Sequence, residues 1–221
     1  MFVLLIQDEG LVGISNFMTF FSNDQFRECA VMTSEIYTPS KEELDSRIGR
    51  YADLQAMSTE GELGWVGQDA MDVFFARKIM PVILDDTKNP FGNISPIVGA
   101  AGATMFISVM PPGQGPCLHS HNTTFETFMV LQGQIEYRIG DPIAHRVTLD
   151  RFDTFSCPPK VYREFRNVGE IDAIQLTVIT GQGDNRDDVS IANSVEVAVG
   201  KDHGDKVVDA FREVFSFDPP H

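Results

Sequence analysis

Three side chains with metal-ligand chemistry lie close together near the middle of the chain. His119 and His121 are two positions apart, so in a β-strand both imidazoles project from the same face. Glu126 follows the polar turn at 122–124, and a strand that returns beside the first is expected to bring its carboxylate to the histidines. Two neutral imidazoles and a carboxylate suit Fe(II), Mn(II), Ni(II) or Zn(II), and they leave positions open for water, dioxygen or substrate. The spacing therefore predicts a divalent-metal site.

The elements that must position these residues are predicted to be mostly β-strands. From about residue 94 onward, short apolar runs alternate with Gly and Pro turn signals. A spacing of about 8–12 residues between such signals is typical of an antiparallel sandwich or barrel. Earlier in the chain, capping-box spacing between Ser40 and Glu43 predicts a helix over about 41–57. The segment 69–84 fits a helix followed by a strand, or a strand throughout.

These patterns predict a barrel with a segment on either side. Residues 1–90 are expected to form an N-terminal extension that packs on the barrel, residues 91–200 the barrel itself, and 201–221 a closing amphipathic helix and tail. Within the extension, residues 1–31 are predicted to be an upstream segment that packs against the body or another subunit.

The frame around the three candidate ligands resembles the first motif of the cupin superfamily. It runs from Gly113 through His119, His121 and Glu126 to Gly133. The stretch 153–167, DTFSCPPKVYREFRN, is similar to the second cupin motif in its Asp, its Pro-Pro, the aromatic after them and its closing Phe-x-Asn. Together the motifs cover about 100–181. The resemblance implies an all-β fold, a cupin-type double-stranded β-helix or jelly-roll barrel, with its site in the mouth.

The second motif departs from the family pattern at its ligand position. The family usually supplies a third histidine there, and the matching residue is Arg163; Lys160 and Phe152 stand where the motif has glycines. A guanidinium has only donors and stays protonated, so Arg163 cannot replace the lost ligand. Two arrangements remain open. Either a metal binds the three first-motif ligands and Arg163 holds an anionic substrate group or polarises a bound oxygen, or Arg163 pairs with Glu126 and the barrel holds no metal.

Other residues near the motifs have weaker claims to function. Tyr162 and Phe128 are expected to line a substrate pocket, although packing alone explains them equally well. Cys157 is expected to fill the core, and Cys117 shares the histidine strand with only a minor claim as a ligand. His145 is expected at the surface.

Composition excludes several classes of protein. The net charge of −15 disfavours binding to phosphate backbones, so no nucleic-acid partner is expected. The apolar start MFVLLI is too short for a membrane span and lacks the basic residues of a signal peptide, so no membrane partner is expected. Three cysteines without paired spacing indicate a reducing, cytoplasmic setting.

The leading hypothesis is an enzyme, a mononuclear metal-dependent oxygenase of the dioxygenase type that acts on a small anionic or aromatic molecule. The cofactor is one divalent metal ion, with Fe preferred and Mn, Ni or Zn as alternatives. Its ligands are His119, His121 and Glu126, and Arg163 orients a carboxylate or stabilises an oxyanion. The competing hypotheses are a non-catalytic, possibly metal-free, small-molecule-binding cupin, and a cupin isomerase or lyase. The resemblance also implies a homodimer.

Overall fold

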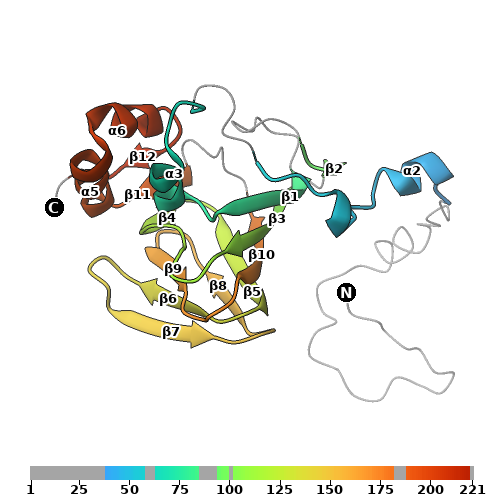
Figure 1. Cartoon of the computed structure of the whole chain (residues 1–221). Coiled ribbons are helices and arrows are strands. Elements are labelled where there is room, and N and C mark those ends of the chain that lie inside the picture. The colour runs from blue at the N-terminus through green and yellow to red at the C-terminus, as the bar shows by residue number, and fades with distance from the viewer. Residues whose placement is uncertain (1–37, 58–62, 85–93, 100–101, 182–187, 220–221) are drawn as a thin grey trace, which may run out of the picture. The chain divides into compact units, whose positions relative to one another are not determined.

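The computed structural model describes residues 38–57, 63–84, 94–99, 102–181 and 188–219 (Figure 1). The chain divides into two units, 1–40 and 41–221, and all the helices and strands described here belong to the second. The predicted upstream segment, residues 1–31, lies outside the described residues. Among the described residues, no helix is both long and apolar enough to cross a membrane.

Two six-stranded sheets dominate the fold, and most neighbouring strands in them are antiparallel. The first sheet has the order β2 (Ile97–Val98), β1 (Lys78–Leu84), β3 (Ala103–Met110), β10 (Ala173–Thr180), β5 (Phe125–Gln132), β8 (Thr154–Cys157). The second sheet has the order β12 (Ser216–Phe217), β11 (Val189–Ile191), β4 (His119–His121), β9 (Arg163–Asn167), β6 (Ile135–Ile139), β7 (His145–Leu149). Among the strands of the described residues, only β1–β2 and β11–β12 pair in parallel. This architecture confirms the predicted all-β, cupin-type barrel.

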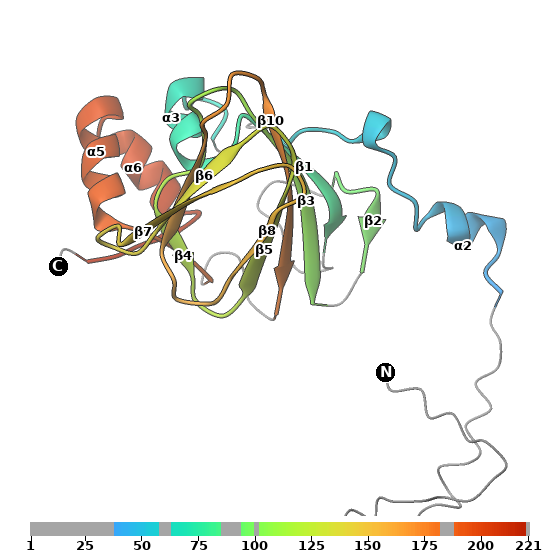
Figure 2. The same cartoon turned by 90° about the horizontal axis from the view of Figure 1, so that it is seen from below.

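Helices gather at one side of the barrel and bury their own apolar cluster there. They are α3 (Gln68–Phe74), α5 (Asn193–His203) and α6 (Asp205–Arg212), which lie together in both views (Figures 1 and 2). In α6 the buried residues Val207, Val208 and Phe211 form one apolar face, as the sequence predicted. The Phe211 ring stacks on Phe74 of α3, with 3.8 Å between the ring centroids. These contacts fix α3 and the C-terminal segment against each other beside the barrel.

Alternation along the strands places one set of side chains inside the barrel. In β5 the inward residues are Glu126, Phe128 and Val130, and every second residue between them is less buried. Phe128 is fully buried and contacts the rings of Tyr137 and Phe165 from the opposite sheet. The two sheets thus close around an aromatic core. Glu126 is the inward-facing residue of β5 just before Phe128, so it lies at the edge of that core.

The structure refines several predicted boundaries. The helix predicted over about 41–57 is present only as α2 (Lys41–Asp45) and a 3-10 turn, η1 (Tyr51–Asp53). None of α2's residues is buried, so no tertiary packing supports a longer helix. The segment 69–84 contains a helix and then a strand, the first of the two alternatives. The predicted extension of 1–90 thus contributes β1 to a barrel sheet, and α5 lies within the range predicted as barrel.

Four motif positions have a left-handed backbone, and only two of them are glycines. Gly113 and Gly133, which bound the first motif, have φ of 79° and 77°. Phe152 and Lys160, which stand where the second motif has glycines, have φ of 74° and 64°. Side chains with a Cβ adopt this region at a cost of about 1–3 kcal/mol. The barrel therefore retains the turn geometry of the motif even where the glycine has been replaced.

Restoring glycine at these positions is expected to stabilise the protein. Phe152→Gly and Lys160→Gly should each raise the free energy of unfolding by about 0.5–1.5 kcal/mol, since relief of the strain outweighs the added freedom of the unfolded chain. Denaturant unfolding followed by circular dichroism measures the change. Lys201→Gly on α5 is the matched control and should destabilise by about 1 kcal/mol, because it places glycine inside a helix. Loss of stability in both strained variants would refute the strain argument.

Candidate metal centre

The three predicted ligands meet inside the barrel, but they come from different sheets. His119 and His121 lie on β4 in the second sheet, whereas Glu126 lies on β5 in the first sheet. The expectation that β5 returns beside β4 in one sheet was therefore wrong. The turn at 122–124 instead crosses between the sheets, and β4 pairs with β9 and β11. Glu126 reaches the histidines across the interior, because both strands turn these side chains inward.

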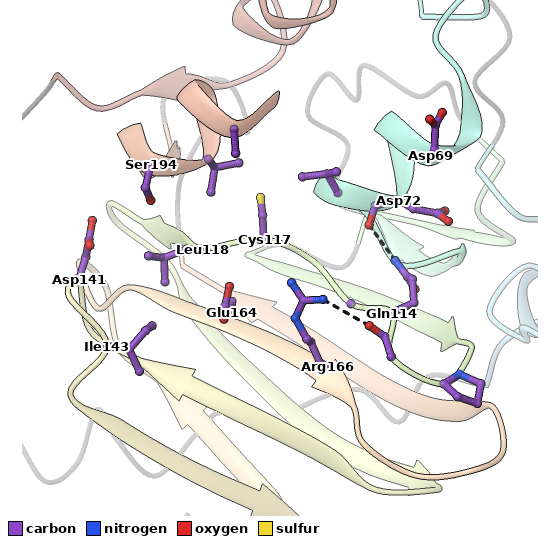
Figure 3. A pocket seen from close by; sticks show the side chains of 16 residues that line it. Asp69, Asp72, Gln114, Cys117, Leu118, Asp141, Ile143, Glu164, Arg166 and Ser194 are labelled. Carbon is purple, nitrogen blue, oxygen red and sulfur yellow. Dashed lines mark hydrogen bonds between the residues drawn. The ribbon is translucent and has the colours of Figure 1, made fainter. Parts of the chain in front are cut away.

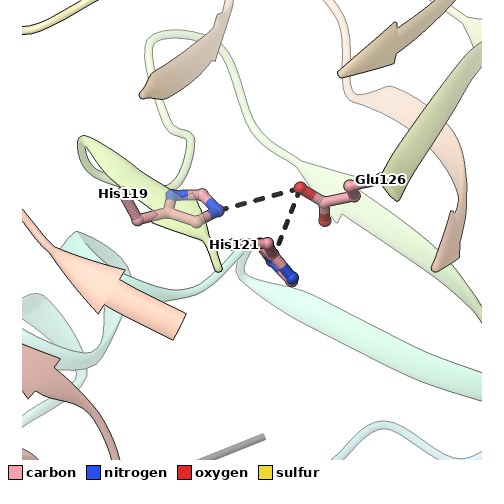
Figure 4. Close-up of side chains that lie close together, drawn as sticks. All are labelled: His119, His121 and Glu126. Atoms are coloured by element: carbon pink, nitrogen blue, oxygen red, sulfur yellow. Dashed lines mark ion pairs between the residues drawn. The ribbon is translucent and has the colours of Figure 1, made fainter. Parts of the chain in front are cut away.

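The ligand atoms of the three residues converge on a single point (Figure 4). Nε2 of His119 lies 3.8 Å from Oε2 of Glu126, and Nε2 of His121 lies 3.7 Å from the same oxygen. One ligand atom from each residue lies within 4.8 Å of the others. Metal–ligand bonds of about 2.0–2.2 Å to nitrogen and oxygen require ligand atoms at separations of this order. The arrangement is a candidate metal site, as the sequence predicted.

Hydrogen bonds on the far side of each ring fix the tautomers of both histidines. Nδ1 of His119 lies 2.7 Å from the carbonyl oxygen of Cys117, and Nδ1 of His121 lies 2.8 Å from a carboxylate oxygen of Asp188. Both partners can only accept, so each Nδ1 must carry the hydrogen. Each Nε2 therefore turns a lone pair toward the Glu126 carboxylate, which is also an acceptor. Convergence of three acceptor atoms is the chemistry of a cation site, so the residues present fit a metal ion.

Arg163 contacts the same carboxylate from the other side. It lies directly opposite His119 in the pairing of β4 with β9, and its side chain is fully buried. Its Nε donates to Oε2 of Glu126 at 3.0 Å, and its Nη2 forms a second, shorter bond to that oxygen. The sequence is compatible with Arg163 facing substrate or pairing with Glu126, and the structure shows the pair. Arg163 is also not among the residues that line the cavity described below.

The charges of the site follow from its burial and from the guanidinium. Burial lowers the pKa of His119, and the positive charge of Arg163 lowers it further, so the ring stays neutral. Burial alone would raise the pKa of Glu126, but the positive charge of Arg163 is the main opposing effect, and that pKa lies below its usual range. A neutral imidazole and an ionised carboxylate are the forms in which these groups bind metal.

Asp188 is a functional residue that sequence analysis missed. Its buried carboxylate accepts the Nδ1 hydrogen of His121. It also accepts hydrogen bonds from the backbone amides and the side-chain hydroxyls of both Thr123 and Thr124. Burial opposes its ionisation, but the bonds from His121 and the threonines outweigh that effect and keep its pKa below the usual range. A carboxylate behind a ligand histidine orients the ring and increases its basicity. No spacing rule connects Asp188 to His121, since 67 positions separate them.

Removing this carboxylate is expected to weaken metal binding without unfolding the barrel. Asp188→Asn keeps the shape of the side chain but removes the charge behind His121, and the Kd for Mn(II) should rise about 10–100-fold. Isothermal titration of metal-free protein measures the affinity. Asp202→Asn, at an exposed position of α5, is the control and should bind as the unchanged protein does. An unchanged Kd in Asp188→Asn would show that Asp188 is purely structural.

A small cavity opens from the three ligands, and its walls are largely apolar. It has a volume of about 150 Å³ and contains His119, His121 and Glu126 in its lining. Five phenylalanines contribute to its walls, namely Phe74, Phe75, Phe106, Phe165 and Phe215. The predicted pocket residues lie elsewhere: Phe128 is buried in the core below, and Tyr162 is not part of the lining. Phe128 fills the interior because it is one inward position deeper on β5 than Glu126.

A wider groove lies away from the candidate metal site. It has a volume of about 710 Å³ between α3, α5 and the second sheet, and Asp69, Asp72, Asp141 and Glu164 give it an acidic lining around Arg166 (Figure 3). Cys117 also borders this groove, and burial raises the pKa of its thiol to about 12. Among the described residues, it is not part of the group of ligand atoms formed by His119, His121 and Glu126. Cys157 is a core residue and His145 is exposed, as predicted.

Residues 106–179 match a family described as the cupin domain, and this range contains all three candidate ligands and Arg163. No curated protein sequence matches the chain.

Solved structures with a similar fold align over part of the chain. A Klebsiella pneumoniae protein with a double-stranded beta-helix domain has a TM-score of 0.34 and 22% identity, over 36% of this chain and 68% of its own. A predicted oxalate decarboxylase from Thermotoga maritima has a TM-score of 0.34 and 23% identity, over 37% and 69%. A structure from work on the DMSP lyases RdDddP and RnDddQII has a TM-score of 0.40 and 15% identity, over 52% of this chain and 51% of that chain. Similarity at this level does not transfer an activity.

Proposed function

Since residues 106–179 match the cupin domain, we propose that the chain is a mononuclear, metal-dependent oxygenase that acts on a small anionic or aromatic molecule. One observation carries the proposal. Three acceptor atoms, from His119, His121 and Glu126, converge at the end of an apolar cavity. Two histidines and one carboxylate with open positions are the ligand set of non-haem Fe(II) oxygenases, so iron is the preferred metal. When bound, the metal supplies a centre at which dioxygen and substrate can be held side by side.

The residues of the chain have separate tasks in this proposal. His119, His121 and Glu126 hold the ion, and Asp188 keeps the His121 ring in the orientation and tautomer that binding needs. Arg163 holds the Glu126 carboxylate in place and keeps it ionised, which replaces the substrate-binding role expected from the sequence. The phenylalanines of the cavity exclude water from the reacting groups.

A second candidate is a metal-free protein that binds a small molecule. The bond from Arg163 to Oε2 of Glu126 favours it, because the guanidinium already balances the carboxylate that a metal needs. The convergence of two histidine lone pairs on the same oxygen favours the metal-dependent reading. The carboxylate has about four lone-pair sites, two on each oxygen, and Arg163 donates twice to Oε2, so the other oxygen, Oε1, can still offer a lone pair to a cation.

Oxygen consumption tests the reaction class. Metal-free protein reconstituted with one equivalent of Fe(II) is mixed with small aromatic acids and 2-oxo acids, and dissolved oxygen is followed with an electrode. The proposal expects uptake that is coupled to loss of one of these compounds, and that disappears in His121→Ala. Saturable binding without oxygen uptake by iron-loaded protein would point instead to the binding protein, and metal-dependent turnover without oxygen would point to an isomerase or lyase. The homodimer and the cytoplasmic location stay predictions.

A further inference from the structure

Two hydroxyl groups lie in the lining of the cavity that opens from the candidate metal site. They belong to Ser108 of β3 and Thr177 of β10, which are neighbouring strands of the first sheet. Both residues are more than nine-tenths buried, with exposed fractions of 6% and 5%. In the strand pairing Ser108 lies opposite Gln175, the inward residue two positions before Thr177. The two hydroxyls therefore belong to diagonal neighbours on one face of the sheet, with Cβ atoms about 7 Å apart, and an acceptor placed between them can face both.

A chain of hydrogen bonds from the core sets the direction of the Thr177 hydroxyl. The hydroxyl of Tyr137 donates to Oε1 of Gln175 at 2.6 Å, and Nε2 of Gln175 donates to Oγ1 of Thr177 at 3.0 Å. Turning the amide over would leave the buried Tyr137 hydroxyl without an acceptor among the described residues, so this orientation holds. Burial also raises the pKa of Tyr137, which keeps its hydroxyl protonated.

It follows that Thr177 is a donor toward the cavity. Its oxygen already accepts from Gln175, and its own hydrogen has no acceptor among the described residues. The Ser108 hydroxyl makes no hydrogen bond to any residue in the described part of the chain, although it borders the cavity. Both hydroxyls open onto the cavity with capacity for a further hydrogen bond, which a bound acceptor can use.

We propose that the hydroxyls of Thr177 and Ser108 bind an uncharged acceptor oxygen, such as a ketone, on the substrate. The inference rests on the proposed function, in which a metal is held by His119, His121 and Glu126. The anionic group of the substrate faces that metal, and the acceptor oxygen lies at the other end of the molecule. The substrate class is thus a small oxo acid with an apolar body, rather than a hydrocarbon acid. The Tyr137–Gln175–Thr177 chain preorganises the donor, so Gln175 is a positioning residue in this site.

Matched five-carbon acids test this assignment. Binding of pentanoate, 2-oxopentanoate and 4-oxopentanoate to Mn(II)-loaded protein is measured by isothermal titration, and the metal content of each variant is measured separately. 4-Oxopentanoate should bind roughly three- to tenfold more tightly than pentanoate, since its remote ketone offers an acceptor to the hydroxyls. 2-Oxopentanoate, whose keto oxygen can chelate the metal beside the carboxylate, is the control for tighter binding through the metal alone. Thr177→Val should abolish this preference, Ser108→Ala should reduce it, and Thr177→Ser should keep it. Pentanoate affinity should change little in all three variants.

Several results would overturn the assignment. They are equal affinity for 4-oxopentanoate and pentanoate, no saturable binding of either acid, or a preference for 4-oxopentanoate that survives in Thr177→Val. A fall in pentanoate affinity equal to that in oxo-acid affinity in Thr177→Val would also overturn it, because only packing would then have changed. Failure of the proposed function is distinguished by the metal measurement. If the protein binds no Mn(II), the oxo-acid preference is measured in metal-free protein, where the hydroxyls alone must produce it.

Discussion

Replacing Arg163 with methionine is expected to lower the free energy of unfolding of the metal-free protein by about 3–5 kcal/mol. The variant leaves the Glu126 carboxylate buried beside two histidine lone pairs without the guanidinium that stabilises it. Methionine retains much of the volume, so the loss reflects charge rather than a cavity. Denaturant unfolding in the presence of a chelator measures the effect.

Two further variants isolate the ion pair. Arg166→Met, three positions along β9 at an exposed site, should change the free energy of unfolding by less than about 1 kcal/mol. Glu126→Met combined with Arg163→Met should recover most of the lost stability, because an apolar pair replaces a buried ion pair at little cost. If Arg163→Met alone were as stable as the unchanged protein, the buried ion pair would contribute nothing to the free energy of unfolding, contrary to this prediction.

Replacing Arg163 with histidine is expected to tighten metal binding by about 100-fold or more. Structural zinc sites with four ligands bind with about 10–16 kcal/mol, or roughly 2.5–4 kcal/mol for each ligand. A ligand gained is therefore worth about two to three orders of magnitude in Kd. Position 163 lies opposite His119 on the neighbouring strand and faces Glu126, so an imidazole there is directed at the same point. The variant also removes the Arg163 guanidinium, which binds the carboxylate of the ligand Glu126.

Arg163→Met serves as the comparison for this gain, since it removes the guanidinium without adding a ligand. Competition titration with a chelator of known Zn(II) affinity compares both variants with the unchanged protein. The affinity of Arg163→Met reports the effect of the lost cation, and the further increase in Arg163→His reports the new ligand. Equal affinities in the two variants would mean that position 163 is not directed at the metal, contrary to the geometry described.

The parts of the site that the sequence predicted are those encoded by short spacing. His119 and His121 share a strand face, and Glu126 follows within one turn, so their proximity depends on few long-range contacts. The route by which they meet was predicted incorrectly, because spacing within 119–126 does not reveal whether the next strand joins the same sheet. Only the strand order, which depends on residues as distant as β10 and β11, settles that.

Other parts of the site depend on contacts that no local pattern indicates. Asp188 reaches His121 only because β11 pairs with β4. In β10, Gln175 and Thr177 alternate with apolar residues, a pattern that normally places the polar residues in solvent. The structure turns this polar face inward, where Gln175 accepts from the hydroxyl of Tyr137 and Thr177 borders the cavity. Such a reversal marks a site where local preference yields to function.

The central claim is that His119, His121 and Glu126 hold one divalent metal ion beside Arg163. It is tested most directly by anomalous diffraction from crystals of the protein. The protein is expressed in metal-supplemented medium and purified without chelators, and data are collected on both sides of the iron, manganese, nickel and zinc absorption edges. We expect one anomalous peak per chain, within bonding distance of Nε2 of His119, Nε2 of His121 and a carboxylate oxygen of Glu126. Ordered side chains at these positions with the Arg163–Glu126 pair intact and no peak between them would contradict the account.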